Sequence, residues 1–185
     1  GSRSVDLFGI LGDEQLNLQV MSLPKRINLP VLTRGRLPET ENECVVDEKL
    51  VSSGVCRVGD TITLRSGDDT KTEDILRTDT FTVTGAVVSP CYLSLERGTS
   101  GIGNGTRSGF LMIPDSAFSM DYYTQICVTA KGALELNCYE ETYGDLVEDL
   151  TDRLEGLSEE RSSIRFAQVK EEGEEQIADA EEEIR

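Results

Sequence analysis

The sequence predicts an α+β fold, with a small mixed β core, packed helices and a C-terminal helical arm that leads toward a stalk or coiled coil. Three observations favour this class. The first 139 residues contain short segments in which apolar and polar residues alternate, separated by turn-rich stretches. From residue 140 onward, apolar residues recur at spacings of three and four. This second part also carries 17 acidic and 5 basic residues, a net charge of −12 out of −17 for the 185-residue chain.

Six short strands are expected in the body of the chain, residues 5–139. The clearest is at residues 80–88, where Phe81, Val83 and Gly85 alternate with threonines. A short helix is expected at residues 47–53, and clusters of Gly, Asp and Ser such as residues 66–69 mark turns. The expected strands are residues 16–20, 44–46, 61–64, 80–88, 110–113 and 125–129.

Two helical segments are expected after the core. Residues 140–158 place Tyr143, Val147, Leu150, Leu154 and Leu157 on one face, which fits packing on the sheet. Gly156 and the polar residues 158–163 then allow a break, so that residues 159–185 form a separate, truncated stalk helix. The apolar positions expected along this second helix are Ile164, Val169, Ile177, Ala180 and Ile184.

Both ends of the chain are expected to have been cut from a longer parent protein. The last turn lacks a Gly or Asn cap and carries glutamates at residues 181–183, where a helix end favours cations. We therefore expect the helix to continue in the parent. Residues 1–4 are expected to be an expression scar and linker, because Gly1 and Ser2 stand where an initiator Met would be.

The composition disfavours several kinds of partner and chemistry. The acidic arm argues against nucleic acid or an anionic lipid surface as partner. The chain has no histidine, which removes Ser-His-Asp and Cys-His nucleophile pairs, imidazole acid-base catalysis and histidine metal sites. Its five cysteines include no CxxC pair, so buried free thiols are favoured over one disulfide, and a zinc site is disfavoured. No cofactor is expected.

Two polar loops resemble ion-binding or phosphate-binding sequences. The carboxylate pairs Asp68/Asp69 and Glu73/Asp74 are expected to be solvated surface groups, with a weak calcium site as the alternative. The glycine-rich residues 98–106 lack the Lys-Ser/Thr ending of a phosphate-binding P-loop and precede an expected strand. A structural loop with positive φ angles is therefore favoured there, and its Asn-Gly-Thr sequence also matches the short pattern of a glycosylation acceptor.

Two linked groups of motifs resemble a known family of membrane proteins. The first group reads GRLPE at residues 35–39, NECVVD at 42–47, VGDTITL at 58–64 and FTVTGAV at 81–87. This order resembles the extracytoplasmic core domain of FtsX-like and MacB-like ABC transporter permeases. The second group reads SPCY at 89–92, ERGT at 96–99, GNG at 103–105 and DYYT at 121–124, and is similar to a Gram-positive-type branch of that family. Within these motifs, Gly35 and Gly59 suit tight turns and Gly85 lets another backbone approach the strand.

The resemblance implies a non-catalytic domain on the extracellular side of the cell membrane, inserted between the first two transmembrane helices of a permease. Hydrolysis of ATP would take place on a separate cytoplasmic ABC ATPase. The domain would transmit motion between the membrane helices and an external protein or exported substrate, as a rigid body with a helical stalk. The parent permease is expected to be able to form a dimer.

The expected contact surface is the loop from Tyr92 to Arg107 together with the exposed side of the terminal helix. Its best single candidates are Tyr92, Arg97, Asn104, Tyr122 and Tyr123. The structural alternative is that the tyrosines fill the edge of the core with their hydroxyls in water, and that Arg97 pairs with Glu96 or Asp121. Two other classes of function stay open: a cell-surface adhesin or structural interaction module, and an enzyme with a pocket of carboxylates.

Overall fold

The computed structural model describes the backbone of residues 1–183 and the side chains of residues 1–174 and 177. The chain divides into two compact units, Gly1–Cys127 and Val128–Arg185. The second unit holds the short helix η2 (Ala133–Glu135) and the long helix α3 (Glu141–Glu183). The first unit holds β1 (Ser4–Leu11), β2 (Glu14–Ser22), β3 (Val31–Gly35), β4 (Glu43–Asp47), α1 (Glu48–Ser52), β5 (Thr61–Arg65), α2 (Thr72–Ile75), β6 (Thr80–Val88), β7 (Gly109–Ile113) and η1 (Asp115–Ala117).

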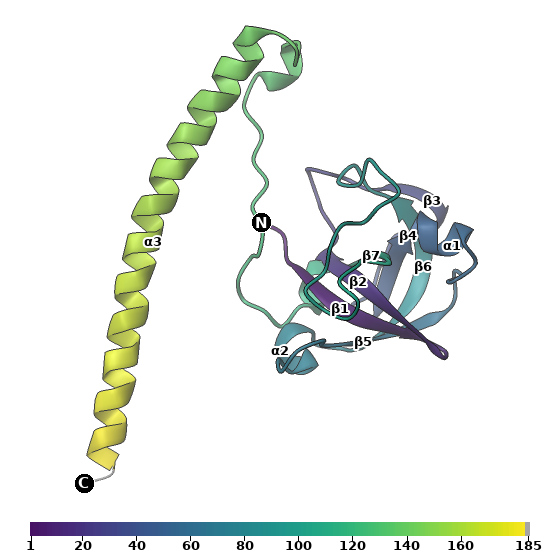
Figure 1. The fold of residues 1–185 in the computed structure, drawn as a ribbon, viewed down its shortest axis with the longest axis horizontal. Coiled ribbons are helices and arrows are strands. Elements are labelled where there is room, and N and C mark those ends of the chain that lie inside the picture. The colour runs from purple at the N-terminus through teal and green to yellow at the C-terminus, as the bar shows by residue number, and fades with distance from the viewer. Residues whose placement is uncertain (184–185) are drawn as a thin grey trace. The chain divides into compact units, whose positions relative to one another are not determined.

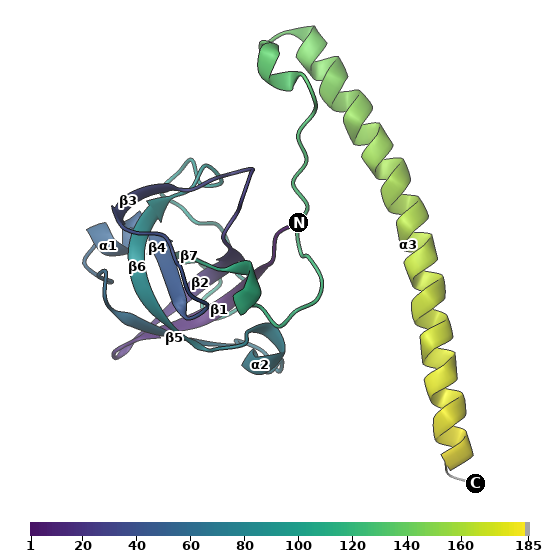
Figure 2. The same ribbon diagram turned by 180° about the vertical axis from the view of Figure 1, so that it is seen from behind.

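Six strands of the first unit close into a β-barrel. They follow the order β6-β4-β7-β2-β1-β5, and β5 pairs back onto β6 (Figures 1 and 2). The pairs β2–β7 and β4–β6 are parallel, and the other neighbours in the ring are antiparallel. The predicted α+β class with a mixed β core is therefore confirmed in its coarse form, and the closed ring removes most of the strand edges that an open sheet would leave unpaired.

Strand β6 organises one side of this barrel because it has three partners. One edge of β6 pairs with β4, from Glu43 opposite Thr82 to Asp47 opposite Val87. Its other edge is shared: β5 pairs with its first residues, and β3 pairs with its last four. A strand of nine residues is long enough to serve two short partners on one edge.

The apolar alternation in the sequence accounts for the interior of the barrel. Phe81 and Val83 of β6 are fully buried, whereas Thr80 and Thr82 are exposed. Every residue of β7 is buried, because Leu111 and Ile113 belong to the interior cluster while Phe110 and Met112 belong to a second cluster with Val45 and Val87. This second cluster lies on the other face of the sheet, and Met21, Leu23 and Tyr92 pack against it.

Five of the six expected strands are confirmed, as β2, β4, β5, β6 and β7, and the expected short helix is α1. The strand expected at residues 125–129 is wrong, since only an isolated bridge between Ser2 and Gln125 forms there. Strands β1 and β3 were not expected from the sequence. β1 alternates only partly, and all five residues of β3 are exposed, so no apolar face marks it.

Residues 1–4, expected to be a scar and linker, are hydrogen-bonded into the barrel. The amide of Ser2 donates to the carbonyl of Gln125 at 2.7 Å, and the amide of Gln125 donates to the carbonyl of Ser2 at 3.0 Å. The side chain of Arg3 bonds the Asp115 carboxylate at 2.6 Å, and β1 begins at Ser4. The beginning of the barrel and the segment that leaves it therefore lie side by side.

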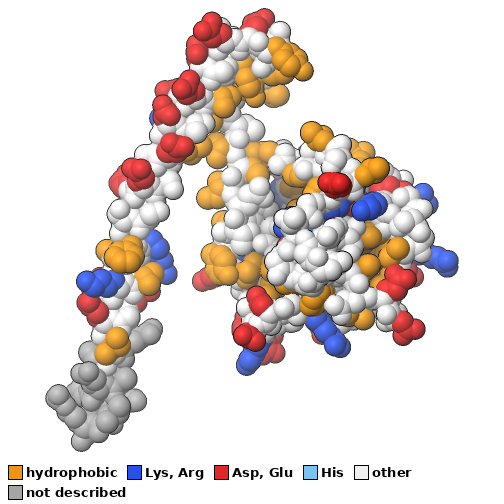
Figure 3. Space-filling model, viewed as in Figure 1, with side chains coloured by type: hydrophobic (Ala, Val, Ile, Leu, Met, Phe, Trp, Pro, Cys, Tyr) orange, Lys and Arg blue, Asp and Glu red, His pale blue; other side chains and the backbone are white. Residues whose placement is uncertain are grey.

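In the second unit, α3 is one continuous helix of 43 residues. The break expected at residues 158–163 is not present. Gly156 costs a helix only about 1 kcal/mol, and the polar residues that follow include Glu159, Glu160 and Arg161, which favour helix. Within the side chains described, carboxylates outnumber cations along α3 (Figure 3), and no helix in the described part of the chain combines the length and apolarity that crossing a membrane requires.

The apolar face predicted for residues 140–158 leaves Val147, Leu154 and Leu157 at 37%, 38% and 50% exposure. Ile164, Val169 and Ile177 of the predicted second helix are also exposed. The remaining predicted positions, Ala180 and Ile184, lie outside the described side chains. Packing of this face on the sheet, and its role as a stalk or coiled coil, stay predictions.

Candidate functional site

The structure brings two of the five predicted contact residues, Tyr92 and Arg97, into one cluster against the barrel. The ring of Tyr92 stacks on Phe110 of β7, with ring centroids 5.0 Å apart and planes within 8° of parallel. The guanidinium carbon of Arg97 lies 5.2 Å from the centroid of the Tyr92 ring and 6.0 Å from that of the Phe110 ring, so the guanidinium is next to both rings. Burial raises the pKa of Tyr92, and its hydroxyl donates to Oε1 of Gln19 on β2. This cluster covers the outer face of β7 and anchors the loop after β6.

Arg97 is held by a carboxylate that the sequence did not single out. Its Nε donates to Asp47 Oδ2 at 2.5 Å and its Nη2 donates to Asp47 Oδ1 at 3.1 Å. Asp47 is fully buried and Arg97 is 9% exposed, so the expected pairing of Arg97 with Glu96 or Asp121 is wrong. The hydrogen bond to Asp47 raises the pKa of Arg97. Asp47 Oδ1 also accepts from the amide of Lys49, so the same carboxylate caps α1.

Asn104 has a structural role in the glycine-rich loop. Its Oδ1 accepts from Nδ2 of the buried Asn17 at 3.0 Å and from the amide of Thr106 at 3.1 Å. Asn17 also donates to the carbonyls of Ile102 and Thr106 at 3.2 and 3.1 Å. Gly103 has a φ of 59°, and a Cβ there would lie 2.6 Å from Asn17 Oδ1. The predicted structural loop with positive φ angles is therefore confirmed.

The loop between β6 and β7 is thus fixed to the barrel at several points. Arg107 adds a third anchor, since its Nε and Nη2 bind the Asp6 carboxylate of β1 at 2.8 and 3.1 Å. The outward side of the loop presents Leu93 and Leu95, which are 97% and 81% exposed. Asn104 is also exposed, whereas Tyr92 is half-buried and Arg97 is buried.

Tyr122 and Tyr123 follow η1 and are both exposed. The Tyr123 ring lies over the guanidinium of Arg3, with 4.8 Å between the guanidinium carbon and the ring centroid. Arg3 also donates from Nε to the carbonyl of Met120 at 2.8 Å. Tyr123 therefore packs on Arg3, and Tyr123 also lines a pocket.

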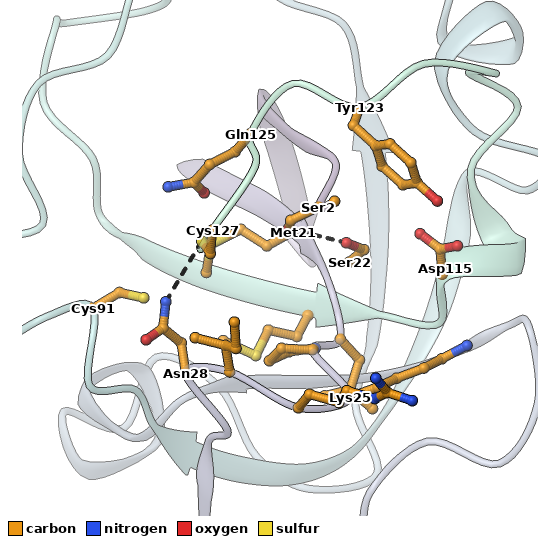
Figure 4. A pocket seen from close by; sticks show the side chains of 16 residues that line it. Ser2, Met21, Ser22, Lys25, Asn28, Cys91, Asp115, Tyr123, Gln125 and Cys127 are labelled. Atoms are coloured by element: carbon orange, nitrogen blue, oxygen red, sulfur yellow. Dashed lines mark hydrogen bonds between the residues drawn. The ribbon is translucent and has the colours of Figure 1, made fainter. Parts of the chain in front are cut away.

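A pocket of about 370 Å³ lies at the end of the barrel where β1 begins. Its walls come from residues 1–2, the ends of β2 and β7, the segment 23–28 that follows β2, and the single residues Cys91, Asp115, Tyr123, Gln125 and Cys127. Figure 4 shows Cys91, Asn28 and Cys127 on one side of this pocket, with Asp115 and Tyr123 on the opposite side. The Asn28 amide nitrogen is 3.8 Å from the Cys127 sulfur. This volume is within the range of small-molecule sites, about 300–1,000 Å³.

The pocket combines an apolar wall with two basic residues. Met21, Leu23, Ile27 and Met112 supply the apolar surface, and Lys25 and Arg26 lie on the segment that closes one side. The carboxylate of Asp115 also lines it, but Oδ1 of Asp115 is bound by Arg3. An arrangement of this kind favours ligands with both an apolar and an anionic part.

The two carboxylate pairs expected at the surface, Asp68/Asp69 and Glu73/Asp74, are exposed. Asp68 is exposed, and hydrogen bonds to its carboxylate, chiefly from Ser66, lower its pKa. Among the described residues, no group of three or more His, Cys, Asp or Glu side chains is arranged to hold a metal ion. All five cysteines are free thiols, with Cys44 and Cys56 buried.

No protein-family model and no curated protein matches this chain.

Sequence reasoning missed Asp47, Asn17 and the pocket. Asp47 could have been found, because an acidic residue that ends an apolar strand and precedes a helix is a typical N-cap. Asn17 sits between two apolar residues of an expected strand, where a buried polar side chain needs a partner. The pocket has no such signal, since its residues come from separate segments between residues 1 and 127.

Proposed function

We propose that this chain is the extracytoplasmic domain of an ABC transporter permease of the FtsX-like and MacB-like type. In this proposal the domain has no catalytic activity of its own and lies on the outer side of the cell membrane. It transmits conformational change between the membrane helices of the permease and an external protein or exported substrate. Hydrolysis of ATP takes place on a partner ATPase in the cytoplasm.

One observation carries the proposal: the four motifs of the first group meet on a single strand. The motif at residues 81–87 forms most of β6. Each of the other three motifs is hydrogen-bonded to the backbone of β6. The amides of Arg36 and Gly59 donate to the carbonyls of Thr84 and Val83, at 2.9 and 2.8 Å. The carbonyl of Asn42 accepts from the amide of Thr82 at 2.8 Å. Motifs spread over 53 residues therefore build one structural unit, which supports treating them together as parts of one domain.

The second group of motifs is attached to the first through side chains. Arg97 of ERGT binds Asp47, the last residue of NECVVD. Tyr92 of SPCY stacks on Phe110 and faces Arg97. The two groups that carry the resemblance are therefore physically coupled, which supports treating them as one domain.

The geometry of the ends of the barrel suits a domain inserted into a membrane protein. Ser2 and Gln125 are hydrogen-bonded to each other, so the strand that enters the barrel and the segment that leaves it meet at one place. A closed barrel attached at one place can move as a rigid body. A continuous helix such as α3, which at 43 residues is about 65 Å long, can carry a displacement over that distance.

The proposal is tested by isolating the full-length gene product from its own cells. We expect it to be extracted only with detergent and to bring down an ATPase of the ABC class. A variant with the ATPase nucleotide site inactivated should still co-purify, because the subunits assemble independently of hydrolysis. Recovery in the soluble fraction, or a single membrane anchor with no ATPase, would contradict the proposal and favour a cell-surface adhesin or structural interaction module.

A further inference from the structure

The pocket at the beginning of β1 has a chemistry that the proposed function does not use. It lies entirely within the first unit, and its apolar wall is continuous with the outer cluster of the barrel, because Met112 belongs to that cluster and Met21 and Leu23 pack against it. Met21, Leu23 and Ile27 are only partly buried, so part of their apolar surface faces the pocket. An occupant with an apolar part would remove this surface from water.

The charged side chains that line the pocket are two cations and one carboxylate. Lys25 and Arg26 are exposed, and neither makes an ion pair with a carboxylate within 4.0 Å among the described side chains. The one carboxylate in the lining, Asp115, is held by Arg3 at 2.6 Å. Two adjacent cations without an ion-pair partner among the described side chains therefore lie beside an apolar wall.

We propose that this pocket binds an anionic amphiphile, with its hydrocarbon chain against Met21, Leu23 and Ile27 and its carboxylate or phosphate at Lys25 and Arg26. A purely polar anion would leave the apolar wall in water, and an uncharged hydrocarbon would leave the two cations without a partner. An occupant with both parts satisfies both features. The chemistry of the pocket does not depend on whether the barrel belongs to a permease.

The cysteines provide built-in reporters for occupancy. Cys91 and Cys127 line the pocket and are accessible to solvent. Cys138 is exposed and belongs to the second unit, so its reactivity is an internal reference. Cys44 and Cys56 are fully buried in the barrel, so modification of either one would report unfolding.

The experiment measures the rate of alkylation of each cysteine by N-ethylmaleimide, using peptide mass spectrometry, with dodecyl phosphate or dodecanoate below the micelle concentration. We expect each of these to slow modification of Cys91 and Cys127 at least fivefold, while Cys138 is unaffected and Cys44 and Cys56 remain unmodified. Shortening the alkyl chain should weaken the protection about three- to fourfold per CH₂ removed. Inorganic phosphate, dodecyl maltoside and dodecyltrimethylammonium should each protect at least tenfold less well.

The double variant K25A/R26A should weaken protection by both anionic amphiphiles at least tenfold. Both side chains are exposed, so this variant is expected to fold, and the matched control K49A/K71A removes two cations from elsewhere on the same unit. Equal protection by dodecyl maltoside, or unchanged protection in K25A/R26A, would overturn the role of the cations. Protection by inorganic phosphate alone would replace the amphiphile site with a simple anion site, and absence of protection by all probes would overturn the proposal.

Discussion

The carboxylate of the fully buried Asp47 binds the guanidinium of Arg97 through two hydrogen bonds, at 2.5 and 3.1 Å. Asp47 ends β4 and caps α1, whereas Arg97 lies 50 residues later in the loop between β6 and β7. This pair connects the two groups of motifs on which the resemblance to permeases depends. It also holds the loop that is expected to contact a partner against the barrel.

Removing one partner of this pair should strongly destabilise the first unit. Arg97→Met keeps an apolar side chain over Tyr92 but leaves the Asp47 carboxylate buried without its cation. We expect the free energy of unfolding to fall by about 3–5 kcal/mol, measured by urea denaturation with an unchanged slope.

The matched control is Lys71→Ala, because Lys71 and Glu73 form an exposed pair at 3.8 Å. Its loss should change the free energy of unfolding by less than about 0.5 kcal/mol. If Arg97→Met were as mild as this control, the Asp47–Arg97 pair would not have the structural importance assigned to it.

Gly85 should tolerate no side chain. A Cβ at this position would lie 2.6 Å from the carbonyl oxygens of both Arg34 and Arg36, where β3 crosses close to β6. Gly85→Ala should therefore push β3 away and lower the free energy of unfolding by about 1–3 kcal/mol, measured by thermal or urea denaturation. Gly101→Ala, where a Cβ meets nothing within 4 Å, should be close to neutral. An equal effect of both substitutions would contradict the close approach.

The Arg36–Glu43 pair should make stability depend on pH in the acid range. Hydrogen bonds from Arg36, and from the amides of Glu39 and Thr40, lower the pKa of Glu43 from 4.5 to about 2. Because the folded-state pKa is the lower one, the stabilisation is present above pH 4.5 and is lost as the pH falls toward 2.

We therefore expect Glu43→Gln to be less stable than the unsubstituted protein near neutral pH, with the difference shrinking as the pH falls through this window. Urea midpoints measured at several pH values test this. Glu41→Gln, in the same turn, should shift the midpoint much less. A difference for Glu43→Gln that stayed constant with pH would show that the substitution acts by another route.

The five thiols should fall into two classes of reactivity. Burial raises the pKa of Cys44 well above its ordinary range and raises that of Cys56 to about 11, so both are protonated as well as inaccessible near neutral pH. Cys91 and Cys138 are exposed and Cys127 is half-buried. Titration with a chromogenic disulfide should count three thiols in the folded protein and five in denaturant. Rapid reaction of Cys44 or Cys56 in the folded protein would contradict the burial of β4 and its surroundings.

Much of the barrel could be predicted because its strands carry apolar residues in recognisable patterns. The first residues of β6 alternate between exposed and buried, and β7 is an apolar run after its first glycine, so both are visible as patterns. β3 could not be predicted, since its stability comes from pairing with β6 and none of its residues is buried. The close approach predicted at Gly85 is present, because a glycine inside a strand pattern marks contact with another backbone.

Less of the candidate site could be predicted. The sequence predicts Tyr92 and Arg97 as contact residues from their place in a loop, but it does not predict their contacts with Phe110 and Asp47, which are close only in the folded chain. The division of α3 was predicted from Gly156 and neighbouring polar residues, but one glycine among good helix formers is too weak to end a helix.

The most direct test of the central claim is the membrane topology of the full-length gene product in intact cells. Single cysteines would be introduced at Asp69 and Gly101, which are exposed positions, in a background without the native thiols, and labelled with a membrane-impermeant maleimide. If the barrel is an extracytoplasmic permease domain, both positions label in intact cells while a cysteine in a cytoplasmic loop does not. Labelling of Asp69→Cys and Gly101→Cys only after lysis would contradict it.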